Sequence, residues 1–276
     1  MITDLIDFVN DAPQSNRIAS VETFLREMDE TRPIDRYFRN SRSLLAYGTE
    51  PRLTEKLELG RLLLLGLVSE AESFFRSILA ACLEVCPICQ KAAGEKQVNL
   101  GGVLWHGKDG FSRSAFEHMS FSSKNELKSG AQQFLDFKLD DAKFKAPLEE
   151  FEKICQLRHG IVHNAGLLPG RNAVQLGVRK YKRPVEIVVD FASLQEAAAV
   201  VDTLVVTINR ELFGEMCKRW AVDWRRAADW GDANEGKVFN RIWKVFVSQE
   251  ERRSRQGRSK ISAKNCMIAI KRKYNI

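Results

Sequence analysis

Residues 57–83 read LELGRLLLLGLVSEAESFFRSILAACL, and this run decides the fold class. Leu and Phe recur at spacings of three and four residues, which is the period of one face of a helix. Thr54 is a suitable N-cap, and the pattern ends before Pro87. Between Leu62 and Val68 the segment is apolar nearly all round, as expected for a helix buried inside a bundle. We therefore predict an all-α helical bundle that contains this helix.

Capping residues and apolar periodicity predict further helices on both sides of this one. Ser123 and Glu126 have the form of a capping box. Pro147 suits the first turn of another helix, and Asn164 with Gly166 suits its C-terminus. The predicted helices are 21–28 (capped by Ser20 and ended by Arg32-Pro33), 123–137, 148–163, 193–212 (capped by Ser193), 216–230 and 238–251.

Two segments lack a helical pattern. Residues 94–122 are Gly-rich and aperiodic, so we expect an ordered excursion over the bundle surface. Residues 173–178 and 185–189 are rich in β-branched side chains and flank the turn-prone Lys182-Arg183-Pro184. They predict a small β-hairpin directly after helix 148–163.

The net charge of +7 is confined to the C-terminal end of the chain. Residues 250–276 hold nine of the 43 Lys and Arg residues and only two of the 36 Asp and Glu residues. The remaining 249 residues therefore hold 34 of each sign and sum to zero. A basic tail binds polyanions such as RNA, whereas the body carries no such signal.

Nothing in the sequence indicates export. No run approaches the ~20 apolar residues that cross a bilayer, and the first turns carry Asp4 and Asp7 where a signal peptide is basic. Six cysteines are scattered through apolar surroundings in a chain that needs no disulfide framework. We expect a cytoplasmic protein without membrane contact.

The stretch Leu157-Arg158-His159-Gly160-Ile161-Val162-His163-Asn164 carries the candidate chemistry. An Arg and a His five residues apart on a helix are displaced by about 7.5 Å along the axis and roughly 140° around it. A long Arg side chain can swing back toward the imidazole. Two such helices that meet across a dimer bring two Arg and two His side chains to one phosphate. The spacing alone also fits a surface Arg and a His that closes the helix.

RNA cleavage without a metal needs this set of groups. A base removes the proton of a 2′-hydroxyl, an acid protonates the leaving 5′-oxygen, and fixed positive donors stabilise the phosphorane. Imidazole transfers protons near neutral pH, and the guanidinium is a permanently charged planar donor. No metal or other cofactor is then required.

The Arg158 to His163 run resembles the second signature helix of HEPN domains in its Arg-x4-His spacing and flanking residues. Residues 66–79, GLVSEAESFFRSIL, are similar to the first signature helix, where an acidic residue precedes an aromatic-rich face. A strand-rich stretch and a last bundle helix after the motif suit the RiboL-PSP or MAE-type HEPN subgroup. The resemblance covers residues 45–213, which leaves 1–44 as a helical N-terminal extension, 214–251 as a C-terminal helical segment and 252–276 as a basic tail.

This resemblance implies a bundle that dimerises through its signature helices and cleaves RNA to a 2′,3′-cyclic phosphate and a 5′-hydroxyl. Such domains commonly act as toxins or anti-phage effectors on tRNA or other cellular RNA. Arg158 would stabilise the transition state and His163 would be the acid or base. His159 would contact RNA or set the proton state of His163, with Asn164 supporting the site. Glu72 would orient Arg158, or would instead pair with Arg76 within its own helix.

Two possible metal sites are alternatives to the metal-independent nuclease. His159 and His163 have the two-His spacing of zinc hydrolases, but Gly160 replaces the glutamate that such a site needs. Cys86 and Cys89 have zinc-knuckle spacing, and Cys82, His106 or His118 would complete the ligands. A second Cys-x2-Cys pair is absent, so a buried helix end is the simpler interpretation.

Other signals concern RNA contact. The indoles of Trp220, Trp224, Trp230 and Trp243 lie among basic residues and suit either packing, which we favour, or base stacking. The tail residues Arg252, Arg253, Arg255, Arg258 and Lys260 suit phosphate contacts or a solvated tail.

Two further hypotheses remain beside the nuclease. One is a non-catalytic module that binds RNA or a protein through the same groove. The other is the regulated half of a toxin–antitoxin pair, which is blocked by a cognate partner or by modification near the motif.

Overall fold

The computed structural model describes residues 20–28, 31–49, 57–107, 110–139, 141–226, 234–254 and 261–276. The chain divides into two units, residues 1–31 and 32–276. In the first unit only a 3₁₀ turn, Glu22–Phe24, stands where a helix over 21–28 was predicted. That prediction is wrong: Val21, Phe24 and Met28 are all exposed, so no burial stabilises a longer helix. The remaining predicted lead-in, residues 1–19, lies outside the described residues.

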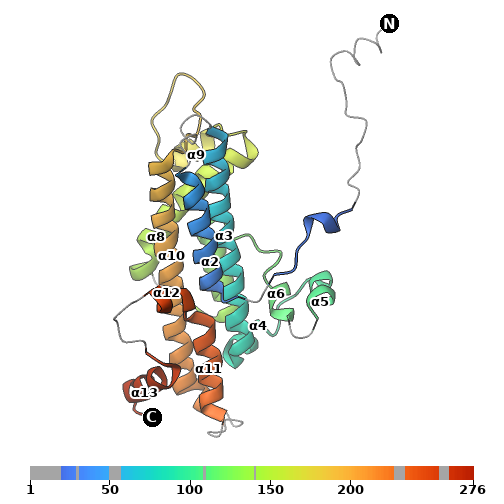
Figure 1. Ribbon diagram of the computed structural model, residues 1–276, viewed down its shortest axis with the longest axis vertical. Helices are drawn as coiled ribbons and strands as arrows, with labels where there is room; N and C mark the ends of the chain where they lie inside the picture. The colour runs from blue at the N-terminus through green and yellow to red at the C-terminus, as the bar shows by residue number, and fades with distance from the viewer. Residues whose placement is uncertain are drawn as a thin grey trace. The chain divides into compact units, whose positions relative to one another are not determined.

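The second unit is helical (Figure 1). Its α-helices are α2 (Pro33–Gly48), α3 (Leu57–Val85), α4 (Pro87–Ala93), α5 (Leu100–His106), α6 (Phe111–Ser114), α7 (Lys124–Leu135), α8 (Asp141–His163), α9 (Gly170–Gln175), α10 (Phe191–Lys218), α11 (Glu235–Phe246), α12 (Gln249–Ser254) and α13 (Ala263–Tyr274). A π-helical turn, Arg219–Asp223, and a 3₁₀ turn, Trp224–Arg226, follow α10 directly. The predicted all-α class is confirmed.

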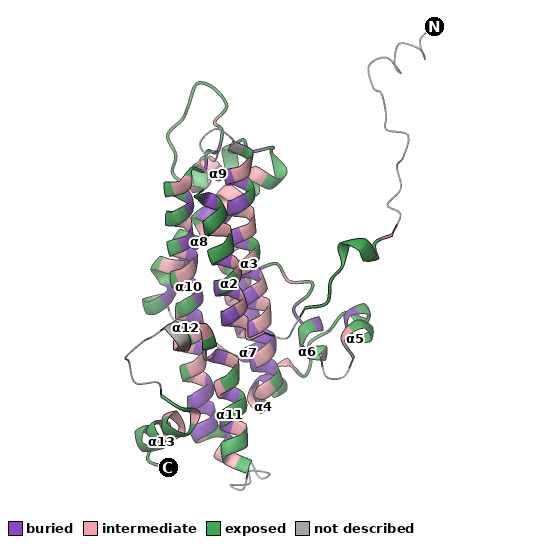
Figure 2. Cartoon of the chain, viewed as in Figure 1, coloured by how far each residue is buried: buried purple, intermediate pink, exposed green. Residues whose placement is uncertain are grey.

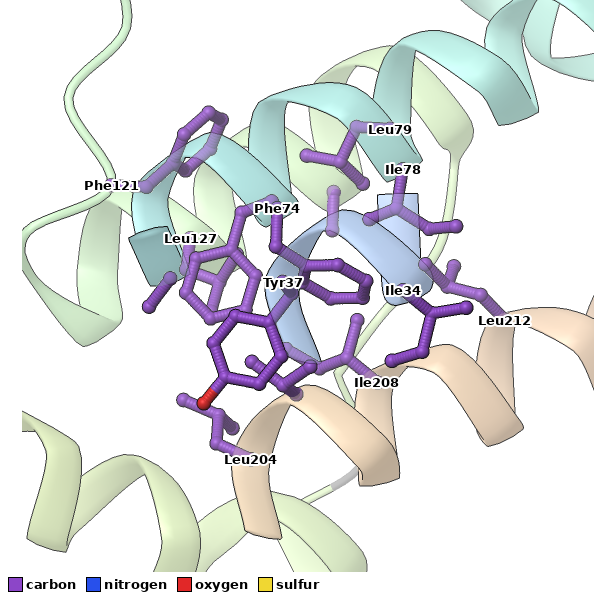
Figure 3. Close-up of a cluster of buried hydrophobic side chains, with 14 of the residues drawn as sticks. Ile34, Tyr37, Phe74, Ile78, Leu79, Phe121, Leu127, Leu204, Ile208 and Leu212 are labelled. Carbon is purple, nitrogen blue, oxygen red and sulfur yellow. The ribbon is translucent and has the colours of Figure 1, made fainter. Parts of the chain in front are cut away.

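Helix α3 is the centre of the bundle, and α2, α8, α10 and α11 pack around it. Its buried side chains continue along almost its whole length, as the purple stripe in Figure 2 shows. Figure 3 shows Phe74, Ile78 and Leu79 of α3 meeting residues of α2 and α10. The apolar run of residues 57–83 thus predicts the buried helix, although its expected cap, Thr54, lies outside the described residues.

Two predicted helix starts and one predicted helix end are wrong, each for a local reason. Arg32-Pro33 does not break a helix but begins α2, because proline suits the first turn. Pro147 lies inside α8, whose first turns are held by the buried Phe144. The cap of α10 is Asp190, which accepts the backbone N–H of Ser193 at 2.8 Å, so the cap lies three residues before the predicted one.

The predicted β-hairpin is also wrong. Residues 170–175 form the short helix α9, and the described residues contain a single isolated antiparallel bridge, Leu167 to Glu186, in place of strands. The β-branched run 185–189 is extended, but it lies against α3 and the end of α8 rather than against a second strand. Its side chains Ile187 and Val189 are buried there.

The expected domain boundaries fall within helices. Residue 45 lies in α2, residue 214 in α10 and residue 252 in α12, and residues 32–276 form one unit. The helical run Phe191–Arg226 has a length and mean hydropathy, 1.5, that fit a membrane-crossing segment. Its Leu194, Val201 and Leu204 belong to the bundle core.

The C-terminal part ends in a docked helix. Cys266, Met267, Ile270 and Tyr274 of α13 pack against the core, and α13 contacts α11 and the π-helical turn. The apolar run of residues 267–270 lies within this helix, and Met267 and Ile270 belong to its packed face.

Candidate active site at the C-terminal end of α8

The last turns of α8 present three polar side chains to solvent. Arg158 is half-buried, and His159 and His163 are exposed. The two imidazole rings lie side by side, with centroids 4.6 Å apart and planes at 48°. A spacing of four residues places both on one face of the helix, so the helix itself brings the two rings together.

Backbone turns close the helix immediately after His163. The Asn164 N–H donates to the Gly160 carbonyl at 3.0 Å, and the Gly166 N–H reaches the same carbonyl at 3.3 Å. Gly166 has a φ of 85°, a left-handed conformation that favours glycine. The C-terminus predicted at Asn164 and Gly166 is thus confirmed, and the exposed Asn164 is the first residue beyond the helix.

The segment 185–189 holds this turn in place. The Ile187 N–H donates to the Gly166 carbonyl at 2.8 Å, and the Leu168 N–H donates to the Val185 carbonyl at 2.8 Å. Arg61 of α3 donates from Nε to the Ile187 carbonyl at 2.8 Å, and its Nη2 lies 2.6 Å from Glu186 Oε1. The guanidinium of Arg61 is buried under Gly166. Arg61 therefore links segment 185–189, and with it the turn after His163, to the central helix α3.

Gly160, between the two histidines, allows this close packing. A Cβ at Gly160 would lie 2.7 Å from Ile187 Cδ1 and 2.9 Å from the Leu167 carbonyl oxygen. The glycine that argues against a zinc hydrolase thus has a structural function. It lets segment 185–189 approach α8 closely at this turn.

The Arg158 guanidinium has no hydrogen bond or ion pair within the part of the chain that the structure describes. It is close enough to Cys155 to act on that thiol electrostatically. Burial raises the pKa of Cys155, the carboxylates of Glu152 and Glu72 add to this effect, and Arg158 opposes it. Arg158 is thus a cation available to an anionic ligand.

Glu72 pairs with Arg76, the alternative partner. Glu72 is 7% exposed, and its Oε2 accepts from Arg76 Nη2 at 2.8 Å. Arg76 Nε also donates to the Met119 carbonyl at 3.1 Å. No Glu72–Arg158 ion pair exists among the described residues, so the structure shows the second of the two predicted roles of Glu72.

Neither candidate metal position holds a ligand cluster in the described part of the chain. The described residues contain no group of three or more His, Cys, Asp or Glu side chains that could hold a metal ion. Cys86 and Cys89 are buried free thiols, and the Cys89 N–H donates to Cys86 Sγ at 3.5 Å. His106 pairs with Glu117 instead of completing a knuckle.

Hydrogen bonds from the thiol and then from the backbone N–H of Cys89 lower the pKa of Cys86 to about 6, and Arg219 also favours its thiolate. Arg219 Nη1 lies 3.4 Å from Cys89 Sγ and donates to the Leu135 carbonyl at 2.7 Å. These buried contacts join α4, the C-terminal end of α7 and the π-helical turn after α10, as expected of a buried helix end.

Of the four indoles that the sequence assigns to packing or base stacking, the three that the structure describes are packing residues. Trp220 and Trp224 are buried, and Trp243 is half-buried against Phe213. Trp230 lies outside the described residues, as do Arg255, Arg258 and Lys260 of the predicted phosphate-binding tail. Arg252 is half-buried in α12, the helix that also contains Arg253.

One other basic feature was not predicted from the sequence. Lys237, Arg241 and Lys244 lie on the exposed face of α11 at spacings of four and three residues. The three cations recur at helical spacing, and this period is the signal that could have located them. The prediction of helix 238–251 was based on its apolar face alone.

Comparisons with protein-family models, with curated proteins and with solved structures gave no match. Function is therefore inferred from the chemistry of these side chains. The arrangement at the end of α8 can bind a phosphate through Arg158 and transfer protons through exposed imidazoles.

Proposed function

We propose that this chain is a metal-independent endoribonuclease of the HEPN type, with Arg158 and His163 as catalytic residues. The observation that carries the proposal is the Arg158 guanidinium, unpaired among the described residues, on the turn of α8 before two exposed, adjacent imidazoles. Such a cation suits a phosphodiester, because guanidinium donors match phosphate oxygens in geometry and charge.

The proposed reaction uses the imidazoles and the Arg158 guanidinium. One imidazole takes the proton of the 2′-hydroxyl, and the 2′-oxygen attacks phosphorus. The bond from phosphorus to the 5′-oxygen breaks as a protonated imidazole gives its proton to that oxygen. Arg158 stabilises the charge on the phosphorane oxygens. The products are a 2′,3′-cyclic phosphate and a 5′-hydroxyl.

The geometry of the two rings favours a composite site in a homodimer. The attacking and leaving oxygens lie roughly in line on opposite sides of phosphorus, so the base and the acid must also lie on opposite sides. His159 and His163 of one chain lie side by side, with centroids 4.6 Å apart. A second copy of the chain would supply the opposing imidazole, with His159 left to contact RNA.

Exposed apolar side chains surround this end of α8 and suit such an interface. Leu62, Val162, Leu167 and Val188 are all more than 40% exposed, and they belong to α3, α8 and the two segments that close the site. Dimerisation would bury these side chains beside the catalytic groups.

The biological setting that fits this activity is a cytoplasmic toxin or phage-defence effector that cuts tRNA or other cellular RNA. The exposed apolar side chains also suit a protein that blocks the site, which favours regulation by a cognate partner.

The test is incubation of purified protein with tRNA and mRNA in excess EDTA. We expect cleavage with cyclic phosphate at the new 3′ ends. RNA that is bound and recovered intact would instead identify a non-catalytic RNA-binding module. Growth arrest on expression that disappears with His163→Ala would support the toxin role.

A further inference from the structure

The solvent face of α11 is a stripe of cations without a carboxylate. The exposed residues of this helix are Gly236, Lys237, Asn240, Arg241 and Lys244. Among the described residues, none of the three cations has a hydrogen bond or an ion pair. We call Lys237, Arg241 and Lys244 the cationic stripe.

Two carboxylates in the described part of this end of the bundle are paired with other cations. Glu235 lies between Arg225 and Lys271, with Lys271 Nζ 2.5 Å from its Oε2. Glu215 accepts from Arg219 Nε at 2.8 Å. These acids therefore neutralise inward-facing cations, and the charge of the stripe remains available to solvent and to ligands.

Helix α13 extends the same basic region. It packs through its apolar face against α11 and the π-helical turn, and it presents Lys264, Arg272 and Lys273 on the exposed side. The tail was predicted to contact phosphate or to be solvated, and its residues 263–274 form a helix that packs on α11. α11 and α13 lie at the end of the bundle opposite α9 (Figure 1).

The stripe is well separated from the candidate active site. α11 packs beside the second half of α10, where Asn209 Nδ2 donates to the Phe246 carbonyl at 2.9 Å. Asn209 lies 18 residues after the start of α10, which corresponds to roughly 27 Å along the helix axis. The end of α8 lies near the start of α10, because segment 185–189 joins them.

We propose that the cationic stripe, extended by Lys264 and Arg272, binds the phosphate backbone of the RNA substrate; this rests on the proposed nuclease function. An RNA that contacts both places must span about 30 Å, so a folded or long RNA gains the second contact and a dinucleotide does not. The stripe thereby selects structured RNA of tRNA scale over short fragments. Its contribution is electrostatic and independent of base sequence.

The experiment compares two variants of equal charge. The stripe variant is K237Q/R241Q/K244Q, and the control is K91Q/K96Q/K138Q, which removes three exposed lysines from α4 and the loops after α4 and α7. Binding to a fully 2′-O-methylated tRNA, which has no free 2′-hydroxyl, is measured by fluorescence anisotropy over a series of KCl concentrations.

We expect the slope of log affinity against log salt to fall in magnitude by about 2 to 3 in the stripe variant, because each phosphate that a cation neutralises contributes about 0.7 to 0.9 to this slope. Its affinity near physiological salt should fall on the order of tenfold. The control variant should match the wild-type protein in both quantities. Equal slopes for the stripe and control variants would overturn the proposal.

Two further measurements distinguish a failure of the nuclease proposal from a failure of the RNA-binding proposal. Cleavage of a dinucleotide should be equal in all three proteins, because it does not reach the stripe. If the wild-type protein cleaves no RNA but the stripe variant binds RNA more weakly than the control variant does, the nuclease proposal is wrong and the RNA-binding role of the stripe is supported. Wild-type binding to phosphatidylserine-containing vesicles together with no binding to the RNA would overturn the choice of RNA as ligand.

Discussion

Gly160 shows how one residue determines whether the end of α8 can form. Its missing side chain leaves room for Ile187 and for the Leu167 carbonyl, which hold the turn that follows His163. The sequence predicts the helical spacing of the two histidines, and their adjacent rings agree with it. It does not predict the tight packing at Gly160, because that packing depends on a segment that arrives about 25 residues later.

Gly160→Ala should therefore destabilise the fold. The new Cβ would lie within 3 Å of Ile187 Cδ1 and of a backbone oxygen, and overpacking of this kind costs about 1–3 kcal/mol. Urea denaturation followed by circular dichroism measures the change.

Gly214→Ala is the matched control. Gly214 is also helical, and its Cβ would meet no atom within 4 Å. This substitution should stabilise the protein by up to about 1 kcal/mol, since alanine favours a helix. Equal free energies of unfolding for the two variants would contradict the packing role of Gly160.

Helices α3 and α7 were predicted because their own sequences define them, whereas segment 185–189, which depends on distant partners, was predicted wrongly. The apolar period of α3 and the capping box of α7, in which Ser123 Oγ accepts from the Glu126 N–H at 3.3 Å, are local signals. The run 185–189 has the composition of a strand, but Arg61 and Gly166 provide its hydrogen-bond partners. No local pattern indicates that arrangement.

Helix α13 offers a prediction at the level of an element. Ile270 lies on its packed face and Ile268 on its exposed face. Ile270→Asp should release α13 from α11, because a carboxylate without a partner is costly where a side chain packs against the apolar core. Hydrogen exchange of amides 263–274 should become much faster in this variant.

Ile268→Asp tests whether the added charge alone has this effect. Its side chain is already partly in solvent, so the exchange of the same amides should stay close to that of the wild-type protein. Fast exchange in both variants would mean that α13 is held by something other than its apolar face.

The arrangement of the bundle places the candidate catalytic groups at one end of α10 and the cationic stripe at the other. Catalysis in the proposed mechanism also needs a second chain at the catalytic end. The sequence suggests this requirement only through the Arg-x4-His spacing. The folded chain adds the apolar side chains exposed around the site.

Val162→Lys should disrupt the proposed dimer. Val162 is 44% exposed on the last turns of α8, and a lysine there would place two like charges at a two-fold interface. Sedimentation velocity should show a shift from dimer to monomer, and RNA cleavage should fall with it.

Val206→Lys is the control, because Val206 is 43% exposed on α10. It should leave both the sedimentation coefficient and the cleavage rate unchanged. A fully active monomer after Val162→Lys would refute the composite site.

The central claim is tested most directly by the rate of tRNA cleavage in excess EDTA, measured side by side for four proteins. The wild-type protein and His118→Ala, which removes another exposed histidine, should cleave with 2′,3′-cyclic phosphate ends. His163→Ala and Arg158→Ala should be folded by circular dichroism and slower by a factor of about 10² or more, a typical contribution of acid–base or charge-stabilising groups. Cleavage by either variant at the wild-type rate, or no cleavage by the wild-type protein, would contradict the account.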